Sequence, residues 1–242
     1  MTPPAKHPVP EPFPGFAGFR DARDAPFYSS RMPGFSTAET TAAEVVVCFS
    51  RVVFAVMREA SRRPLRMSRA DLLRWHRATF RTTFPYQAGK FREEAAVFEI
   101  RWREGGELRR QPLHGSAVFS IATEVDAAFA AYHAELAAHT PEQRTLREAV
   151  VGAAALYAEL LRIHPFEDGN LRAAFPALQG ALISLGAAAV DFEGAVAEHD
   201  EALGWALRSD AGHRTLEPFV DLIVRRITKA ATVEERPTME AS

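Results

Sequence analysis

Two long apolar segments of this 242-residue chain are separated by Ile163-His164-Pro165-Phe166-Glu167-Asp168-Gly169-Asn170-Leu171-Arg172. In both segments, 142–162 and 171–186, apolar residues recur with the period of a helix. Proline, glycine and asparagine interrupt that period in between, because they disfavour the helix interior and favour turns. The sequence therefore predicts a tight loop that joins two buried helices.

The side chains of this loop suit the chemistry of phosphate groups. The second helix is predicted to begin near Asn170, so its first amides have no helical acceptor and can bind an anion. Arg172 can bind phosphate oxygens, and Asp168 is an oxygen ligand of the kind that Mg²⁺ prefers. His164 is the one base in the segment that is effective near neutral pH. Together they predict a phosphoryl- or nucleotidyl-transfer site, and the alternative is an ordinary loop between helices.

The rest of the chain indicates an all-α bundle of roughly seven helices with one small β-hairpin. Ser68 and Asp71 have the spacing of a capping box and open a helix that runs to about Phe80. Alternating residues from Ala96 to Arg103, followed by a Gly-Gly pair, indicate a hairpin at about 97–110. The other helices are predicted from 36 or 37 to Pro64 and at 117–139, 142–162, 171–186, 192–208 and 214–230.

The chain divides into three parts. A Pro-rich arm at 1–34 precedes a helical domain at 35–230, and a polar tail follows at 231–242. The arm either packs its phenylalanines on the domain or is a disordered tail. Net charge is −2 and the pI is near 6.5, so no overall field favours nucleic acid or anionic membranes. We expect neither a signal peptide nor a membrane span, and a single cysteine suits the reducing cytoplasm.

The loop resembles the signature of the Fic family, which is His-x-Phe-x-(Asp or Glu)-Gly-Asn-Gly-Arg-x-x-Arg. The matching residues, at the same spacing, are His164, Phe166, Asp168, Gly169, Asn170 and Arg172. The Ala88-Gly89-Lys90-Phe91-Arg92 turn and the hairpin at about 97–110, at the place of the family's flap, are also similar. The resemblance covers roughly 36–230 and implies the Fido fold, an all-helical bundle with a hairpin flap.

This resemblance implies a function and a role for each matching residue. His164 would deprotonate a Ser, Thr or Tyr hydroxyl of a protein substrate, and Asp168 would hold Mg²⁺. Gly169, Asn170 and Leu171 would cradle the α-phosphate of the donor, and Arg172 would contact the phosphates beyond it. The usual reaction is transfer of AMP from ATP with loss of pyrophosphate. The flap would pair with the protein substrate as an added strand.

Two residues depart from the signature. Leu171 stands where the family has glycine, so its side chain could crowd the phosphates or require a different backbone angle. Phe175 stands where the family has a second arginine, which binds the γ-phosphate and pairs with an inhibitory glutamate. Arg162 and Arg147 are the candidates to replace it. The departures keep two alternatives open: a donor without a γ-phosphate, and a non-catalytic Fido domain that binds a nucleotide or a partner protein.

The sequence also suggests how the site could be inhibited and where His199 lies. The segment from Thr40 to Glu44 matches part of the family's inhibitory motif, so Glu44 is a candidate inhibitor. The alternative for Glu44 is favourable interaction with the dipole of its own helix. A separate inhibitory protein is a further possible partner. His199 and Asp200 are expected on the polar face of their helix.

Overall fold

The structure of the protein is a computed structural model, and it describes residues 39–192, 194–208 and 215–234. The predicted Pro-rich arm at 1–34 lies outside the described residues, as does the predicted tail beyond residue 234. Within the described part, the chain forms seven α-helices and one two-stranded antiparallel sheet, which confirms the predicted all-α bundle with a hairpin.

The elements follow one another in the order that the sequence predicts. They are α1 (Glu39–Ala60), α2 (Arg69–Phe80), β1 (Val97–Glu104), β2 (Glu107–His114), η2 (Val118–Ser120), α3 (Ile121–Ala138), η3 (Pro141–Gln143), α4 (Leu146–Ile163), α5 (Asn170–Ser184), α6 (Val196–Leu207) and α7 (Glu217–Glu234). The last helix continues to Glu234, four residues beyond the predicted boundary of the domain. Among the described helices, none is both long and apolar enough to cross a lipid bilayer.

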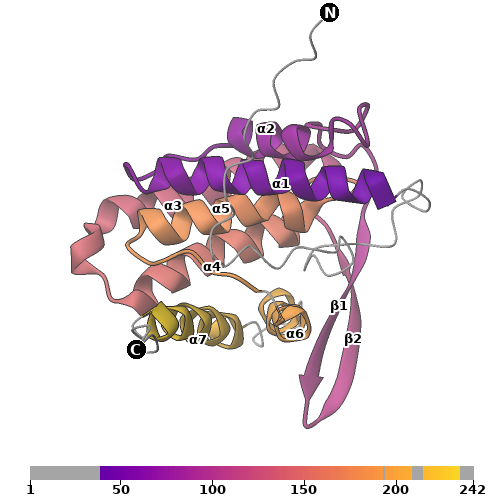
Figure 1. Cartoon of the computed structure of the whole chain (residues 1–242). Coiled ribbons are helices and arrows are strands. Elements are labelled where there is room, and N and C mark those ends of the chain that lie inside the picture. The colour runs from indigo at the N-terminus through magenta and orange to yellow at the C-terminus, as the bar shows by residue number, and fades with distance from the viewer. Residues whose placement is uncertain (1–38, 193, 209–214, 235–242) are drawn as a thin grey trace, which may run out of the picture.

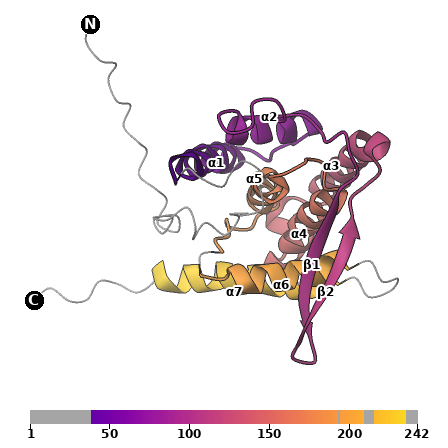
Figure 2. The ribbon, with the colours of Figure 1, turned by 90° about the vertical axis from the view of Figure 1, so that its right-hand side faces the viewer.

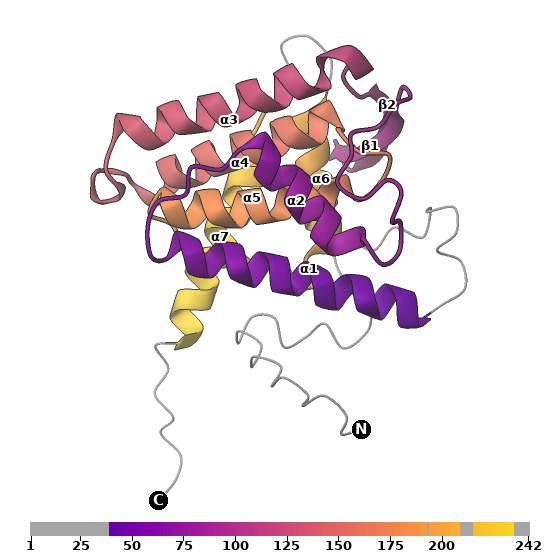
Figure 3. The ribbon, with the colours of Figure 1, turned by 90° about the horizontal axis from the view of Figure 1, so that it is seen from above.

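Helices α4 and α5 form the centre of the bundle (Figure 1). Helices α1 and α2 pack against α5, α3 packs against α4, and α6 and α7 lie below the pair and pack against α4 (Figure 1). Seen from above, α3, α4, α5 and α1 lie side by side (Figure 3). The alanines of α5, including Ala173, Ala177 and Ala181, are buried, because α5 is enclosed by α1, α2 and α4. The loop between α4 and α5 is consequently anchored at both ends in the core.

Local capping interactions set where the helices begin. The predicted capping box of α2 is present, with Ser68 and Asp71 each accepting a hydrogen bond from the other's backbone. Helix α4 begins at Leu146 and not at 142, because Pro141–Gln143 forms a separate 3₁₀ turn. Thr145 then caps α4 through a capping box with Glu148. Thr145 had not been predicted as a cap, and α4 therefore begins later than predicted.

The hairpin is longer than predicted and packs on α6. Its register pairs Val97 with His114, so β2 ends four residues later than expected. Gly105 and Gly106 both have positive φ, as a tight two-residue turn requires. A lone hairpin is marginal in water, and this one runs along one end of the bundle, with its turn beyond α6 (Figure 2). The indole of Trp102 is buried there, and the Arg208 guanidinium lies over it at 4.7 Å.

Gly204 of α6 is where the hairpin comes nearest to the helix, and it offers a test of this packing. A Cβ on Gly204 would lie 1.8 Å from the Arg101 carbonyl oxygen, so Gly204→Ala must push the hairpin away from α6. We expect the free energy of unfolding to fall by about 1–3 kcal/mol. Thermal unfolding measures it.

Gly152→Ala is the matched control. A Cβ on Gly152 of α4 would meet only the end of the Leu185 side chain, at 3.0 Å, which can turn aside. Alanine also has the higher helix propensity. We expect this variant to be as stable as the wild type within about 1 kcal/mol. Equal loss of stability in both variants would contradict the proposed close packing of hairpin and helix.

Candidate active site

A pocket of about 690 Å³ opens between the loop, the hairpin, α2 and α6. Four stretches of chain form its walls. They are His76, Phe80, Phe84 and Gln87 from α2 and the segment after it, 97–101 from β1, Leu161, His164 and 167–172 from the loop and its flanking helices, and Asp200, Leu203, Gly204 and Leu207 from α6. The pocket is lined by all six loop residues that the sequence predicts for the site, which are His164, Asp168, Gly169, Asn170, Leu171 and Arg172.

His164 lies at the end of α4 in a left-handed conformation, with φ 52° and ψ 60°. Its amide donates to the Leu160 carbonyl (3.2 Å), so the chain leaves the helix sharply at this residue. The imidazole is half-buried and stacks on the Phe98 ring of β1, with 4.1 Å between ring centres. Burial, assisted by the charge of Arg92, lowers the pKa of His164 to about 4. The ring is therefore neutral at pH 7 and able to accept a proton.

Asn170 closes the loop on itself. The Phe166 amide donates to Asn170 Oδ1 and Asn170 Nδ2 donates to the Phe166 carbonyl, each at 2.9 Å. The Phe166 ring is fully buried, so this pair of bonds is attached to the core. Because both polar ends of its amide are used, the Asn170 side chain holds the loop. Its predicted contribution to a phosphate cradle is thus limited to its backbone amide.

His76 of α2 contacts the loop through Phe166 and Asp168. No role had been predicted for it from the sequence. Its ring stacks on Phe166 with 3.8 Å between ring centres. The Gly89 amide donates to His76 Nδ1 (2.9 Å), which must then be the unprotonated nitrogen. Nε2 consequently carries the proton and donates to the Asp168 carbonyl (3.1 Å). Burial lowers the pKa of His76 to about 4, in agreement with this neutral tautomer.

The start of α5 faces the pocket with its backbone amides. The first helical amide that donates to a carbonyl four residues back is that of Ala173, to Gly169 (2.9 Å), so the amides of 170–172 have no acceptor within the helix. Gly169 has φ 75°, and a Cβ there would lie 2.3 Å from the Phe80 ring. Only glycine fits this turn, which directs the helix N-terminus into the pocket. This is a favourable place for an anion.

Comparison with known proteins agrees with this geometry. Residues 66–182 match the model of the Fic/DOC family. This part of the chain belongs to the Fic/DOC family. No curated protein matches the chain.

Solved Fic structures have the same fold. C. elegans Fic-1 (residues 134–508) matches with a TM-score of 0.58 and 20% identity, over 84% of this chain and 52% of that one. A Fic-domain signaling protein of Bacteroides thetaiotaomicron matches with a TM-score of 0.59 and 18% identity, over 81% of this chain and 73% of that one. BepC of Bartonella tribocorum, solved with bound AMPPNP, matches with a TM-score of 0.54 and 18% identity, over 83% of this chain and 94% of that one. This chain therefore spans about half the length of the C. elegans structure.

Leu171, the first departure from the Fic signature, fits without strain. Among the described residues other than glycine, His164 alone has positive φ, so Leu171 has an ordinary backbone conformation. Its side chain is half-buried and packs against the core while lining part of the pocket. The backbone amide at this position thus keeps its direction. What the leucine changes is the space beside the amide.

Phe175, the second departure, does not reach the pocket. Its ring is buried in the core beside Phe49 and Phe192, with ring centres 5.8 and 6.2 Å away. The suggestion that Arg162 or Arg147 takes the place of the second arginine is wrong. Arg162 pairs with Glu124 and Glu159, Arg147 pairs with Glu217 and Asp221, and neither lines the pocket. Phe175 therefore replaces a charged group with core packing.

The charges around the pocket are mainly negative. Four carboxylates line it, those of Glu99, Glu167, Asp168 and Asp200, against the two guanidinium groups of Arg101 and Arg172. Arg172 is buried, with Cζ 5.9 Å from the centre of the Phe80 ring. Burial raises the pKa of Asp168, against the opposing effects of the Gly169 amide and the Arg172 charge. The lining therefore contains more carboxylates than guanidinium groups, although Glu99 is ion-paired with Arg101.

Asp168 fits Mg²⁺ that is shared with a ligand. The described residues contain no group of three or more His, Cys, Asp and Glu side chains arranged to hold a metal ion. Mg²⁺ bound with nucleotides commonly uses one or two carboxylates, with phosphate oxygens and waters completing its shell. The pocket-lining carboxylate of Asp168 suits that arrangement. The residues thus favour an ion that binds together with the donor.

Two expectations outside the loop can also be checked. Glu44, the candidate inhibitor, is exposed on α1 and does not line the pocket. His199 was expected on a polar face and that is wrong, because it is fully buried. Its Nδ1 lies 3.2 Å from Asp200 Oδ1, so it orients a pocket carboxylate that the sequence analysis had not selected. The helical spacing from His199 to the buried Ala202, Leu203 and Ala206 is the signal that could have revealed this.

The lowered histidine pKa values predict how stability depends on pH. In the unfolded chain a histidine takes up a proton below about pH 6.5, whereas His76 and His164 stay neutral in the fold down to about pH 4. Stability should therefore fall as the pH decreases from about 6.5 to about 4. His76→Gln should reduce the loss between pH 7 and pH 5 by about 1–2 kcal/mol, measured by urea unfolding at both pH values.

Val150→Ala provides the control for this measurement. It removes buried apolar volume from α4 without a titratable group, so it should lower stability equally at both pH values. If the His76→Gln protein loses as much stability on acidification as the wild type, His76 is not neutral in the fold.

Asn170→Asp tests the closure of the loop. The change removes the donor to the Phe166 carbonyl and places a carboxylate oxygen beside it. We expect a loss of about 1–3 kcal/mol in unfolding free energy. The Phe166 amide should exchange faster than in the wild type, because repulsion between the carboxylate and the Phe166 carbonyl opens the loop. Urea unfolding measures the free energy, and hydrogen exchange with mass spectrometry measures the exchange of the Phe166 amide.

Gln179→Glu is the matched control, because Gln179 forms the same pair of bonds with the Val190 backbone (2.7 and 3.1 Å) away from the pocket. It should lower stability by a similar amount and leave exchange at Phe166 unchanged. An Asn170→Asp protein in which Phe166 exchanges at the wild-type rate would show that other contacts hold the loop.

Proposed function

We propose that this protein transfers AMP, or a related nucleotide moiety, from a nucleotide donor to a Ser, Thr or Tyr hydroxyl of a protein. The observation that carries the proposal is the shared pocket, which is lined by the neutral imidazole of His164, by the residues that begin α5 and by Arg172. A base and an anion site in one pocket are the parts that such a transfer needs. The bound AMPPNP of the BepC structure is further support.

The protein's own groups can carry out each proton and charge movement. His164 accepts the proton of the acceptor hydroxyl, and its ring is held in place by the stack on Phe98. The hydroxyl oxygen bonds to the α-phosphorus while the bond from that phosphorus to the bridging oxygen breaks. With ATP as donor, pyrophosphate leaves. The α5 amides and Arg172 stabilise the negative charge of the phosphates during the transfer.

Mg²⁺ is the cofactor that the pocket suits. Bound with the donor, it neutralises phosphate charge and orients the phosphates. Asp168 is the residue that would hold it, and the excess of carboxylates around the pocket makes binding of a free triphosphate unfavourable. Transfer should accordingly depend on a divalent cation.

The hairpin is the docking element for the protein substrate in this proposal. Residues 97–101 of β1 line the pocket, and Phe98 contacts the His164 ring. The sheet has two strands, so within the described chain each strand is paired along one edge only. An extended segment of a substrate can bind as an added strand through backbone hydrogen bonds. Such a segment would bring its hydroxyl to the imidazole.

The core position of Phe175 favours a variant of this function. No second arginine of the signature contacts the pocket, so the γ-phosphate of ATP gains less there than in a domain that keeps it. A donor without a γ-phosphate, such as a nucleoside diphosphate compound, fits the same α5 amides. A non-catalytic domain that binds a nucleotide or a partner protein is the remaining alternative.

The test is incubation of the protein and a cell lysate with α-³²P-labelled ATP or ADP and Mg²⁺, followed by gel electrophoresis. We expect labelled protein bands with the wild type, and a loss of at least about 100-fold with His164→Ala. The removed base is the physical reason. EDTA should abolish the labelling.

Three outcomes separate the candidate functions. Labelling that is equally strong with ADP and ATP would favour the donor without a γ-phosphate. Equal labelling by wild type and His164→Ala would contradict catalysis by His164. Calorimetric nucleotide binding without any labelling would instead favour the non-catalytic domain.

A further inference from the structure

Arg92 is a buried arginine directly behind the loop, with only 3% of its surface exposed. Its guanidinium donates to three backbone carbonyls: Nε to His164 (2.7 Å), Nη1 to Glu94 (2.5 Å) and Nη2 to Ser116. Its own amide donates to the Pro165 carbonyl (3.0 Å). One side chain thus joins its own segment, which includes Glu94, to two segments that are distant in the sequence, at Ser116 and His164.

Two of these segments are the ends of the hairpin. Glu94 lies just before β1 and Ser116 lies just after β2. The third carbonyl belongs to His164, the proposed base. Arg92 therefore connects both ends of the docking hairpin to the backbone of the residue that must meet the docked hydroxyl.

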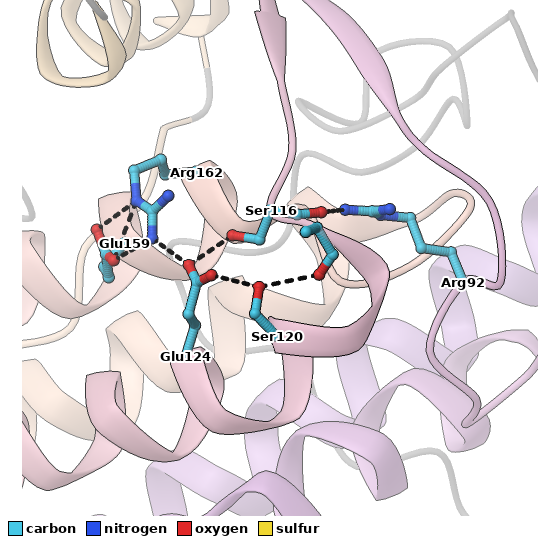
Figure 4. Close-up of polar contacts among 7 residues, drawn as sticks. Arg92, Ser116, Ser120, Glu124, Glu159 and Arg162 are labelled. Carbon is cyan, nitrogen blue, oxygen red and sulfur yellow. Dashed lines mark hydrogen bonds and ion pairs between the residues drawn. The ribbon is translucent and has the colours of Figure 1, made fainter.

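Ser116 is held from the other side as well, as Figure 4 shows. Its amide donates to the Ile163 carbonyl (3.0 Å), and its hydroxyl donates to Glu124 of α3 (2.6 Å). Arg162 of α4 donates to the same carboxylate (2.6 Å). Hydrogen bonds from Ser116, Ser120 and Arg162 outweigh the effect of burial and lower the pKa of Glu124 to about 2. Ser116 is consequently a fixed point against which Arg92 can hold the loop.

Only an arginine has the geometry for this arrangement. A planar guanidinium presents several N–H donors in a rigid fork, whereas a lysine presents one ammonium on a flexible chain. The surrounding space is also small, since a Cβ on Gly115 would lie 2.9 Å from Arg92 Nη2 and 3.0 Å from His164 Cβ. The end of the hairpin therefore packs closely against both the guanidinium and the histidine, and a side chain at position 115 would not fit between them.

We propose that Arg92 is a positioning residue that holds the hairpin and His164 in a fixed relation, so that a hydroxyl docked on β1 meets the imidazole. The inference rests on the proposed transfer function and adds to it a specific residue outside the signature loop. Arg92 does not line the pocket, so it acts through His164 and the hairpin and not on the nucleotide.

The experiment compares Arg92→Lys with wild type in the labelling assay. Lysine keeps the positive charge and loses the fork, so the side-chain bonds that join Glu94, Ser116 and His164 are lost. The backbone bonds to Pro165 and Ile163 remain, so the loop and the hairpin ends stay in contact but are less firmly held. We expect kcat for protein labelling to fall about 100-fold, because a small misplacement of reacting groups can lower the rate by that much. KM for the nucleotide should stay within about threefold, because the phosphate site is unchanged.

Arg226→Lys is the matched control, because Arg226 of α7 also donates from Nε to a backbone carbonyl, that of Asp191 (2.8 Å), away from the pocket. It should label as the wild type does. If Arg92→Lys labels like Arg226→Lys, the proposal is wrong. A merely structural role would lower the amount of active enzyme, and active-site titration with a bound nucleotide analogue would detect that.

A second measurement needs neither a variant nor activity. Under mildly denaturing conditions, hydrogen exchange of the wild type reports the opening free energy of single amides. The amides of Arg92, Ser116 and His164 bond to Pro165, Ile163 and Leu160, so joined segments should open together with one common free energy. Distinct opening free energies for the hairpin ends and the loop would overturn the proposal, whether or not the protein transfers nucleotides.

Discussion

The pair of hydrogen bonds between Asn170 and the Phe166 backbone is the constraint on which the pocket depends. It closes a five-residue turn whose hydrophobic member is fully buried, so the turn cannot move without opening the core. Gly169 then redirects the chain, and α5 begins with its amides facing the pocket. The anion site and the position of His164 both follow from this small closed turn. The stability of the turn itself derives from hydrogen bonds between the Asn170 side chain and the Phe166 backbone and from a buried ring.

Burial also decides the protonation of the site. His76 and His164 are both kept neutral by the cost of burying a charge, and each is useful for that reason. His76 fixes the loop because its tautomer is set by the Gly89 amide, and His164 is available as a base. The carboxylates around the pocket would repel the phosphate groups of a nucleotide that carries no metal ion. In the proposed function, the same pocket would hold a base and a metal-bound phosphate chain.

The sequence allowed much of the fold and of the loop to be predicted, because these depend on local rules. Capping residues, helical periodicity and the Gly-Gly turn predicted the ends of the elements to within about four residues, and α3, α6 and α4 each begin four residues later than predicted. Helix α4 shows one reason. Its start was missed because Thr145 is a second possible cap a few residues after Thr140. His199 was missed because a polar residue was judged by its own chemistry and not by the buried helix face on which it lies.

By itself the sequence determined the order of elements, the tight turn at 163–172 and the set of loop residues that we propose to act on phosphate. It did so because period, caps and turn residues act over a few positions along the chain. The tertiary structure alone decided that Phe175 lies in the core and that Arg162 is used by Glu124 and Glu159. It also decided that Arg92 joins the hairpin to His164. These facts depend on contacts between segments distant in sequence, whose partners are chosen by packing and burial.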